Sequence, residues 1–158
     1  MKLCIKQKVF SWADRFNIMD INGNVLFTAA GELFSWGKKL HVYNNQEQEI
    51  IFIKQRLWTF LPKYEIYLHG QKIAEVVKEF TFMVPRYTIR MLGWEVAGDF
   101  FAHDYTIACG GQHLASMHKE WFTWGDCYVL EIPDSRNTLP AMAVMLAIDC
   151  ITSDQDNN

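Results

Sequence analysis

An internal repeat constrains the fold of this chain more than any other feature of its sequence. Residues 64–89 and 105–130 align without a gap at a constant offset of 41. The identical pairs are Tyr64/Tyr105, Ile66/Ile107, Gly70/Gly111, Gln71/Gln112, Ala74/Ala115, Lys78/Lys119, Glu79/Glu120 and Tyr87/Tyr128. A repeat of this length is one supersecondary unit used twice, and two copies are too few for a solenoid. Each copy is typical of a hairpin that turns at its Gly-Gln pair and is followed by a third strand, so we expect both to belong to one closed sheet.

The other segments before residue 133 also have the patterns of strands and turns. Residues 16–27 predict two strands around an Asn-Gly turn, and residues 40–53 repeat this pattern around Asn44-Asn45. Val76–Phe82 and Tyr128–Ile132 are rich in β-branched and aromatic residues and predict further strands. Turn signals recur about every ten residues without strand–helix alternation, which favours a sandwich or barrel over a parallel α/β fold.

The segment Leu139–Ile148 is apolar on every side and is followed by Asp149. It is too short for a membrane span, which needs about 20 residues. Ala, Met and Leu favour a helix, with Asn137 or Thr138 as its cap and Pro140 in its first turn. Such a helix must be buried by protein, and a barrel of roughly ten or more strands has a lumen that its own side chains do not easily fill. We therefore predict that the C-terminal helix passes through a β-barrel.

Several short motifs, taken in order, resemble those of a known family. They are Phe16-x-Ile18-x-Asp20-x-x-Gly23-Asn24, Gly37-Lys38-Lys39-Leu40, Tyr64-x-Ile66, Gly70-Gln71, Ala74 to Lys78 and Ala141 to Asp149. From about Gln7 to Ile151 the chain resembles the LURP-one-related (YxjI-type) group of the tubby C-terminal-like superfamily.

This resemblance implies a mainly β fold, a closed antiparallel barrel of about a dozen strands around a central hydrophobic C-terminal helix. We expect a single domain over residues 1–152 and a disordered tail over 153–158. Relatives in the superfamily include the tubby phosphoinositide-binding domain and the phospholipid scramblases, whereas the LURP-one-related group has no settled activity. The chain lacks the Pro-rich arm, cysteine cluster and long C-terminal span of the scramblases, so we do not expect lipid scrambling.

Composition excludes several classes of protein. The 158 residues carry a formal charge of −3 with 15% aromatic residues, which argues against a disordered chain and against nucleic-acid binding. No secretory segment follows Met1, and the cysteines form no CxxC pair or zinc-like spacing, so we expect reduced thiols in the cytoplasm, with peripheral membrane association as an option. We expect no cofactor and no metal. The cysteines are Cys4, Cys109, Cys127 and Cys150.

Catalytic signals are weak. The sequence holds no GxSxG, HExxH, P-loop or GxGxxG motif. His113 and His118 fall on opposite faces of a predicted strand and cannot share a metal there. A base within Asp99, His103 and Asp104 is the enzymatic alternative, weighed against a solvated loop. We expect a binding protein rather than an enzyme.

Two sets of charged residues are candidate sites. Lys54 and Arg56 share one face of a strand, with Lys38 and Lys39 one or two strands earlier, and cations so spaced can straddle a phosphate. This favours binding to phospholipid headgroups. The alternatives are a solvated face balanced by Glu47 and Glu49, and a ligand-binding or protein-interaction scaffold in stress or signalling that does not contact lipid. The ligand and the oligomeric state stay open.

The second set is the duplicated lysine of the repeat. Lys78 and Lys119 extend from otherwise apolar strand faces, so one hypothesis is that at least one pairs with Asp149 of the helix. The alternative is that both extend to the barrel rim. Trp121-Phe122-Thr123-Trp124 is a further candidate surface for a partner or lipid tail, because alternation must turn part of it outward.

Overall fold

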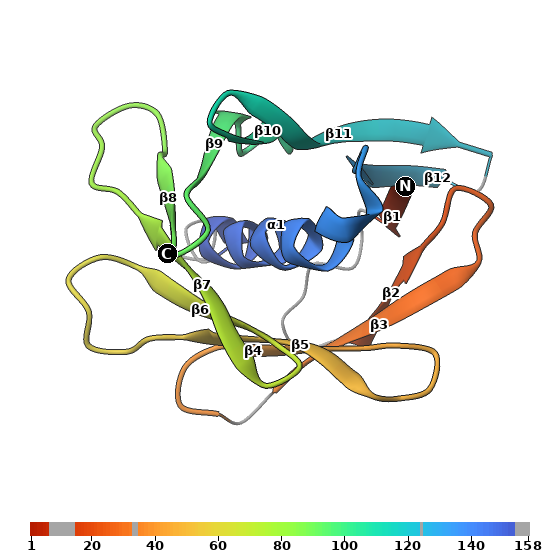
Figure 1. Cartoon of the computed structure of the whole chain (residues 1–158), viewed down its shortest axis with the longest axis horizontal. Coiled ribbons are helices and arrows are strands. Elements are labelled where there is room, and N and C mark those ends of the chain that lie inside the picture. Colours follow the sequence, from red (N-terminus) through yellow and green to blue (C-terminus); the bar gives the residue numbers. More distant parts are fainter. Residues whose placement is uncertain (7–14, 33–34, 124, 154–158) are drawn as a thin grey trace.

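The chain forms a closed β-barrel in a computed structural model that describes residues 1–6, 15–32, 35–123 and 125–153. Within these residues twelve strands follow one another along the chain (Figure 1). They are β1 (Lys2–Lys6), β2 (Arg15–Met19), β3 (Val25–Gly31), β4 (Lys39–Tyr43), β5 (Glu49–Gln55), β6 (Lys63–Leu68), β7 (Gln71–Lys78), β8 (Tyr87–Arg90), β9 (Trp94–Asp99), β10 (Asp104–Cys109), β11 (Gln112–Phe122) and β12 (Gly125–Glu131).

Each strand pairs antiparallel with its neighbours in the chain, and the first strand pairs with the last. Strand β1 closes the barrel through the register Leu3↔Leu130 to β12 and Ile5↔Ile18 to β2. Closure removes the exposed sheet edges that an open sheet of this size would present. The predicted mainly β, closed antiparallel barrel is confirmed.

A single α-helix among the described residues runs through this barrel (Figure 1). After a 3₁₀ turn η2 (Ser135–Asn137), helix α1 (Thr138–Ser153) passes through the lumen, and every residue from 141 to 152 is buried. Inward side chains such as Ile53, Tyr64 and Ile66 pack around it, so the helix is the centre of the core. Within the described part of the chain, no helix has both the length and the hydropathy needed to span a bilayer.

The helix is longer than the apolar segment that predicted it. Pro140 stands in its first turn as expected, but the helix continues beyond Ile148 and ends at Ser153. Ser153 therefore belongs to the helix and not to the tail predicted over 153–158, because the lumen still surrounds the chain at Asp149 and Thr152. The rest of that predicted tail, residues 154–158, lies outside the described residues.

The two copies of the repeat have the same strand register. Tyr64 pairs with Val76 and Tyr105 with Met117, which are equivalent positions in the two copies. Both hairpins also contain a β-bulge at equivalent positions, after Ile66 and after Ile107. The predicted unit of a hairpin and a third strand is confirmed for β6–β8 and for β10–β12.

One strand prediction is wrong in its extent. The pattern over Val76–Phe82 predicted a strand, but β7 ends at Lys78, and Phe80 and Phe82 are 74% and 94% exposed. Pro85 limits the pairing of this hairpin, because proline has no N–H to donate and restricts the residue before it. Residues 79–86 form a loop instead.

Candidate functional site

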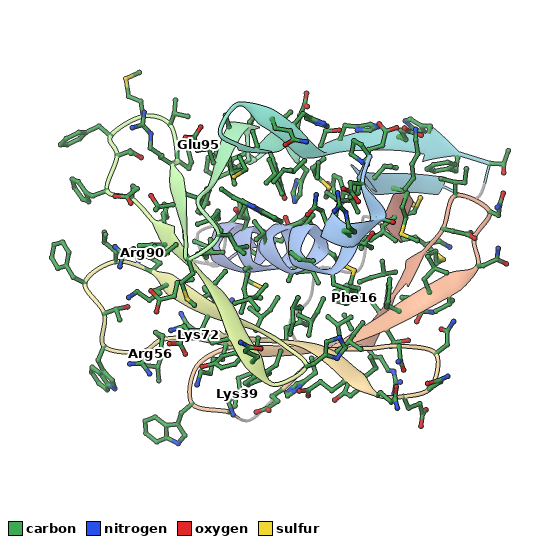
Figure 2. The ribbon with its side chains drawn as sticks, viewed as in Figure 1. Phe16, Lys39, Arg56, Lys72, Arg90 and Glu95 are labelled. Carbon is green, nitrogen blue, oxygen red and sulfur yellow. The ribbon has the colours of Figure 1, made fainter. Side chains whose placement is uncertain are left out.

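Three of the four predicted ligand-binding cations lie together on the outer wall of the barrel. Lys39 of β4 is directly opposite Lys54 of β5, and Arg56 follows Lys54 on the same side of the chain. Figure 2 shows Lys39, Arg56 and Lys72 on the same side of the molecule. Directly opposed side chains on neighbouring strands have Cβ atoms roughly 5 Å apart, so this arrangement concentrates positive charge. We call Lys39, Lys54 and Arg56 the basic wall.

The fourth predicted cation, Lys38, is not part of this wall. Its backbone bonds to Gln55, with the Lys38 N–H donating to Gln55 Oε1 at 3.1 Å and the Gln55 N–H donating to the Lys38 carbonyl at 2.8 Å. Burial lowers the pKa of its ammonium, and Cys150 of the helix is the titratable group that acts against this shift. Because alternate residues of a strand face opposite sides, Lys38 and Lys39 do not converge.

A buried carboxylate underlies the basic wall. Glu65 of β6 has a side chain that is only 8% exposed, and it lies 3.4 Å from Lys54 Nζ and 3.8 Å from Arg56 Nε. Lys72 Nζ is closer, at 2.8 Å. Burial opposes ionisation of Glu65, but hydrogen bonds from Lys72 and Tyr67 outweigh it and hold the pKa of Glu65 below its ordinary value. Glu65 therefore orders the cations of the wall, a role that no pattern in the sequence indicated.

The duplicated lysines are not the partners of Asp149. Asp149 is 95% buried, and its Oδ1 lies 3.1 Å from His103 Nε2. Lys78 is half-buried, and burial lowers the pKa of its ammonium, whereas Lys119 is exposed. Because His103 holds one oxygen of Asp149 and the other oxygen has no hydrogen-bond partner within the described residues, the structure favours the alternative in which the lysines extend to the rim.

A cluster of buried polar groups surrounds the last turns of helix α1. The ring of His103 stacks on Tyr128 at 4.2 Å between centroids, and Tyr87 Oη lies 3.2 Å from Thr152 Oγ1. Asp149 Oδ2 and Tyr105 Oη are buried and have no hydrogen-bond partner within the described residues. Burial raises the pKa of Asp149, although the bond from His103 opposes this shift. Sequence analysis singled out His103 and Asp149 separately, but nothing in the sequence indicated that they meet.

This cluster has little capacity for nucleophilic catalysis. Asp99 and Asp104, which the enzymatic alternative grouped with His103, are exposed on their strands, while His103 reaches inward to Asp149. The adjacent thiol of Cys150 is buried, and burial raises its pKa, which opposes formation of a thiolate. The described residues also hold no group of three or more His, Cys, Asp or Glu placed to bind a metal.

Three loops project at the end of the barrel where helix α1 ends, on the left in Figure 1. We call them the rim loops: the described residues 32 and 35–38 between β3 and β4, 56–62 between β5 and β6, and 79–86 between β7 and β8. Their tips carry exposed aromatic side chains, including Trp36, Trp58 and Phe82. Trp121 is also 80% exposed, as expected, whereas Trp124 lies outside the described residues. The aromatic residues within the turn segments were the sequence signal for these loops.

Comparisons with known proteins agree with this architecture. The family model described as LURP-one-related matches residues 1–149. The chain is 33% identical over 159 residues to the uncharacterized protein YxjI of Bacillus subtilis, covering 100% of this chain and 98% of that protein. It also resembles the X-ray structure of a protein from Arabidopsis thaliana, with a TM-score of 0.64 and 16% identity over 94% of this chain and 90% of that one. At this identity the structural likeness concerns the fold alone, which is tubby-like.

Proposed function

The chain belongs to the LURP-one-related family, and on that premise we propose that it is a non-catalytic binding module that docks on the anionic headgroups of a phospholipid membrane surface. The lumen that could hold a small ligand is filled by helix α1, so a partner binds to this barrel from outside the lumen. The Bacillus subtilis relative is itself uncharacterized. The proposal therefore rests on the geometry of this chain.

The main support for the proposal is the concentration of positive charge at one end of the barrel. The segments 32–39, 54–63 and 78–86 contain seven basic and two acidic residues, a formal charge of +5, although the chain as a whole carries −3. Glu65 and Glu75 of the adjoining strands pair with Lys54, Arg56 and Lys63, so the surface with these two carboxylates included carries +3. These segments are the rim loops with their adjoining strand ends, so the positive charge gathers at one end of the barrel (Figure 1). A basic patch within a Debye length of an anionic leaflet attracts it, by roughly 1 kcal/mol per Lys or Arg near the surface.

The basic wall supplies the headgroup contacts in this proposal. Lys39 and Lys54 oppose each other across β4 and β5, and Arg56 adds a guanidinium that can hold a phosphate in a bidentate way. Glu32 and Glu65 balance these cations in the free protein, at 2.9 Å from Lys39 and 3.4 Å from Lys54. A phosphate must compete with these carboxylates, so we expect modest, salt-sensitive affinity that depends on several headgroups at once.

Vesicle cosedimentation tests the proposal. The chain is mixed with phosphatidylcholine vesicles, or with vesicles that also contain phosphatidylserine or a phosphoinositide, at low salt and at about 0.5 M salt. We expect binding to the anionic vesicles only, weakened by salt. The Lys54→Gln/Arg56→Gln variant should bind at least about tenfold more weakly, since it loses two of the wall's charges. Glutamine is preferred to glutamate because it removes the positive charges without placing new carboxylates beside Glu65. Glu65 keeps Lys72 and Tyr67 as partners in this variant, so we expect the fold to be preserved.

The matched control removes two positive charges from the opposite end of the barrel. Lys2→Gln/Arg136→Gln removes two surface cations that pair with Glu131 and Asp134. This control should bind anionic vesicles as the wild type does. No binding at low salt, or equal losses in the two double variants, would contradict the proposal and favour the protein-interaction scaffold instead.

A further inference from the structure

In the described part of the molecule, the most exposed apolar side chains lie in the rim loops. Among the described residues, the five large hydrophobic side chains that are at least 88% exposed all lie in these three loops. They are Trp36, Trp58, Phe60, Phe82 and Met83. Single exposed hydrophobic residues are ordinary on a protein surface, but a concentration of them at one place marks a contact surface.

The rim loops form one continuous edge rather than three separate features. Gly37 of the first loop packs against the side chain of Leu57 in the second. Lys78, at the start of the third loop, donates its backbone N–H to the carbonyl of Pro62 in the second, at 3.0 Å. Phe80 and Phe82 are also in edge-to-face contact, with ring centroids 5.5 Å apart. The apolar tips are therefore held in a fixed relation by their shared base.

The base of this edge is cationic, directly behind the apolar tips. Arg56 and Lys63 flank the second loop, and Lys78 and Arg86 flank the third. Aromatic rings with Lys and Arg a few residues away match the boundary between the headgroups and hydrocarbon of an anionic bilayer.

We propose that the rim loops insert their apolar tips into the interfacial region of an anionic phospholipid bilayer, so that the end of the barrel where helix α1 ends faces the membrane. This inference rests on the proposed function and adds an orientation and an apolar component to it. The basic wall then contacts headgroups from the side, while Trp58 and Phe60 enter deeper. Binding has a salt-sensitive part from the cations and a salt-resistant part from the loop tips.

Substitution of the second loop tests the insertion in the full chain. Trp58→Ser/Phe60→Ser removes two rings that are 96% and 97% exposed, so the thermal unfolding temperature should not change. Its affinity for vesicles of phosphatidylcholine and phosphatidylserine should fall at least about tenfold, and the binding that remains at high salt should disappear. Trp121→Ser is the matched control, because Trp121 is 80% exposed but lies outside the rim loops. It should bind like the wild type.

A fluorescence measurement gives an independent readout of insertion. Lipids brominated on their acyl chains quench tryptophans that reach the hydrocarbon boundary. The wild type should be quenched by brominated anionic vesicles, and Trp58→Phe should lose a measurable share of that quenching while Trp121→Phe keeps it. Equal quenching of these two variants, or unchanged binding by Trp58→Ser/Phe60→Ser, would overturn the insertion.

The outcomes separate this inference from the proposed function. If Lys54→Gln/Arg56→Gln weakens binding but Trp58→Ser/Phe60→Ser does not, headgroup docking stands and insertion fails. If neither variant changes binding, both fail. If the wild type sediments as a dimer and Trp58→Ser/Phe60→Ser as a monomer, the rim loops form an interface between two copies of this chain, and insertion is likewise overturned.

Discussion

The two copies of the repeat share a register but differ at the end of their second strand. In the first copy β7 ends at Lys78 and residues 79–86 form a rim loop, whereas in the second copy β11 continues to Phe122. Gly125, with φ at 123°, stands where the first copy has Val84, and Asp126 stands where it has Pro85. Glycine allows the backbone conformation that begins β12 so soon after β11, while Val-Pro restricts the equivalent segment and removes a donor.

The comparison distinguishes the features that the two copies share, their hairpin register and inward residues, from the turn in which they differ. The hairpins keep their inward residues, and both bulges lie at equivalent positions, because the lumen around helix α1 must be lined in the same way on both sides. The two copies differ in the segment that follows these hairpins, where β7 ends at Lys78 and β11 continues to Phe122. The first copy carries the exposed Phe80 and Phe82 in a loop between Lys78 and Arg86, whereas the exposed Trp121 of the second copy lies on strand β11.

The largest expected effect concerns the strand that precedes each copy and pairs with its first tyrosine. Tyr105 is paired with Gly98, but the equivalent Tyr64 is paired with Gln55. Gly98 has φ at 141°, and a Cβ there would overlap the carbonyl oxygen of Asp104. We expect Gly98→Ala to lower the free energy of unfolding by about 4 kcal/mol, and Gln55→Ala by about 1 kcal/mol, in urea denaturation. Equal losses would show that β9 can move to accommodate a side chain.

A smaller effect compares two buried tyrosine hydroxyls. Tyr87, in the first copy, bonds to Thr152, so Tyr87→Phe should lower the free energy of unfolding by about 1 kcal/mol. Tyr105, in the second copy, has a buried hydroxyl with no hydrogen-bond partner in the described residues. Tyr105→Phe removes that desolvated group and should leave the stability unchanged or raise it by up to about 1 kcal/mol. A loss in both variants would mean that a water molecule or another partner satisfies the Tyr105 hydroxyl.

The smallest effect is a pH dependence at Asp149, where tyrosines from both copies meet the helix. Burial raises the pKa of Asp149 above its usual 3.8, so its contribution to stability is full below that pH and is lost as pH rises through the folded-state pKa. The stability of the wild type relative to Asp149→Asn should therefore fall as pH rises above 3.8. Thermal melts below and above this pH measure the difference.

Asp134 supplies a control of opposite sign. It is exposed, and hydrogen bonds from Arg136 lower its pKa below the usual 3.8. The stability of the wild type relative to Asp134→Asn should fall as pH drops below 3.8 and stay constant above that pH, and the effect should be weaker because water screens this pair. Parallel trends for the two variants would contradict the assignment of a raised pKa to Asp149.

Sequence analysis predicted the fold because its determinants are patterns repeated over many residues. The offset of 41, the alternation of the strands and the apolar segment at Leu139–Ile148 each repeat one physical requirement several times. The limits of the elements were less predictable. Phe80 and Phe82 favour a strand locally, but Pro85 and the lack of a pairing partner determine a loop.

The sites were harder to predict than the fold because they depend on single contacts between distant residues. Lys39, Lys54 and Arg56 could be grouped from strand alternation, yet Glu65 beneath them could not. The lysines of the repeat were matched to Asp149 from charge alone, whereas the depth of the lumen decides that His103 reaches it. The alternation of side chains along a strand predicts which face of the sheet a residue occupies. It does not predict the position of that residue along the barrel axis.

The place of helix α1 in the chain has a consequence for synthesis in the cell. All twelve described strands precede the helix, so the inward faces of the barrel leave the ribosome before the element that fills them. At roughly 5–20 residues per second, strands in the first half of the chain wait on the order of ten seconds for it. The nascent sheet must spend that interval unclosed or in transient contacts, which makes it a natural client for chaperones that shield apolar strands.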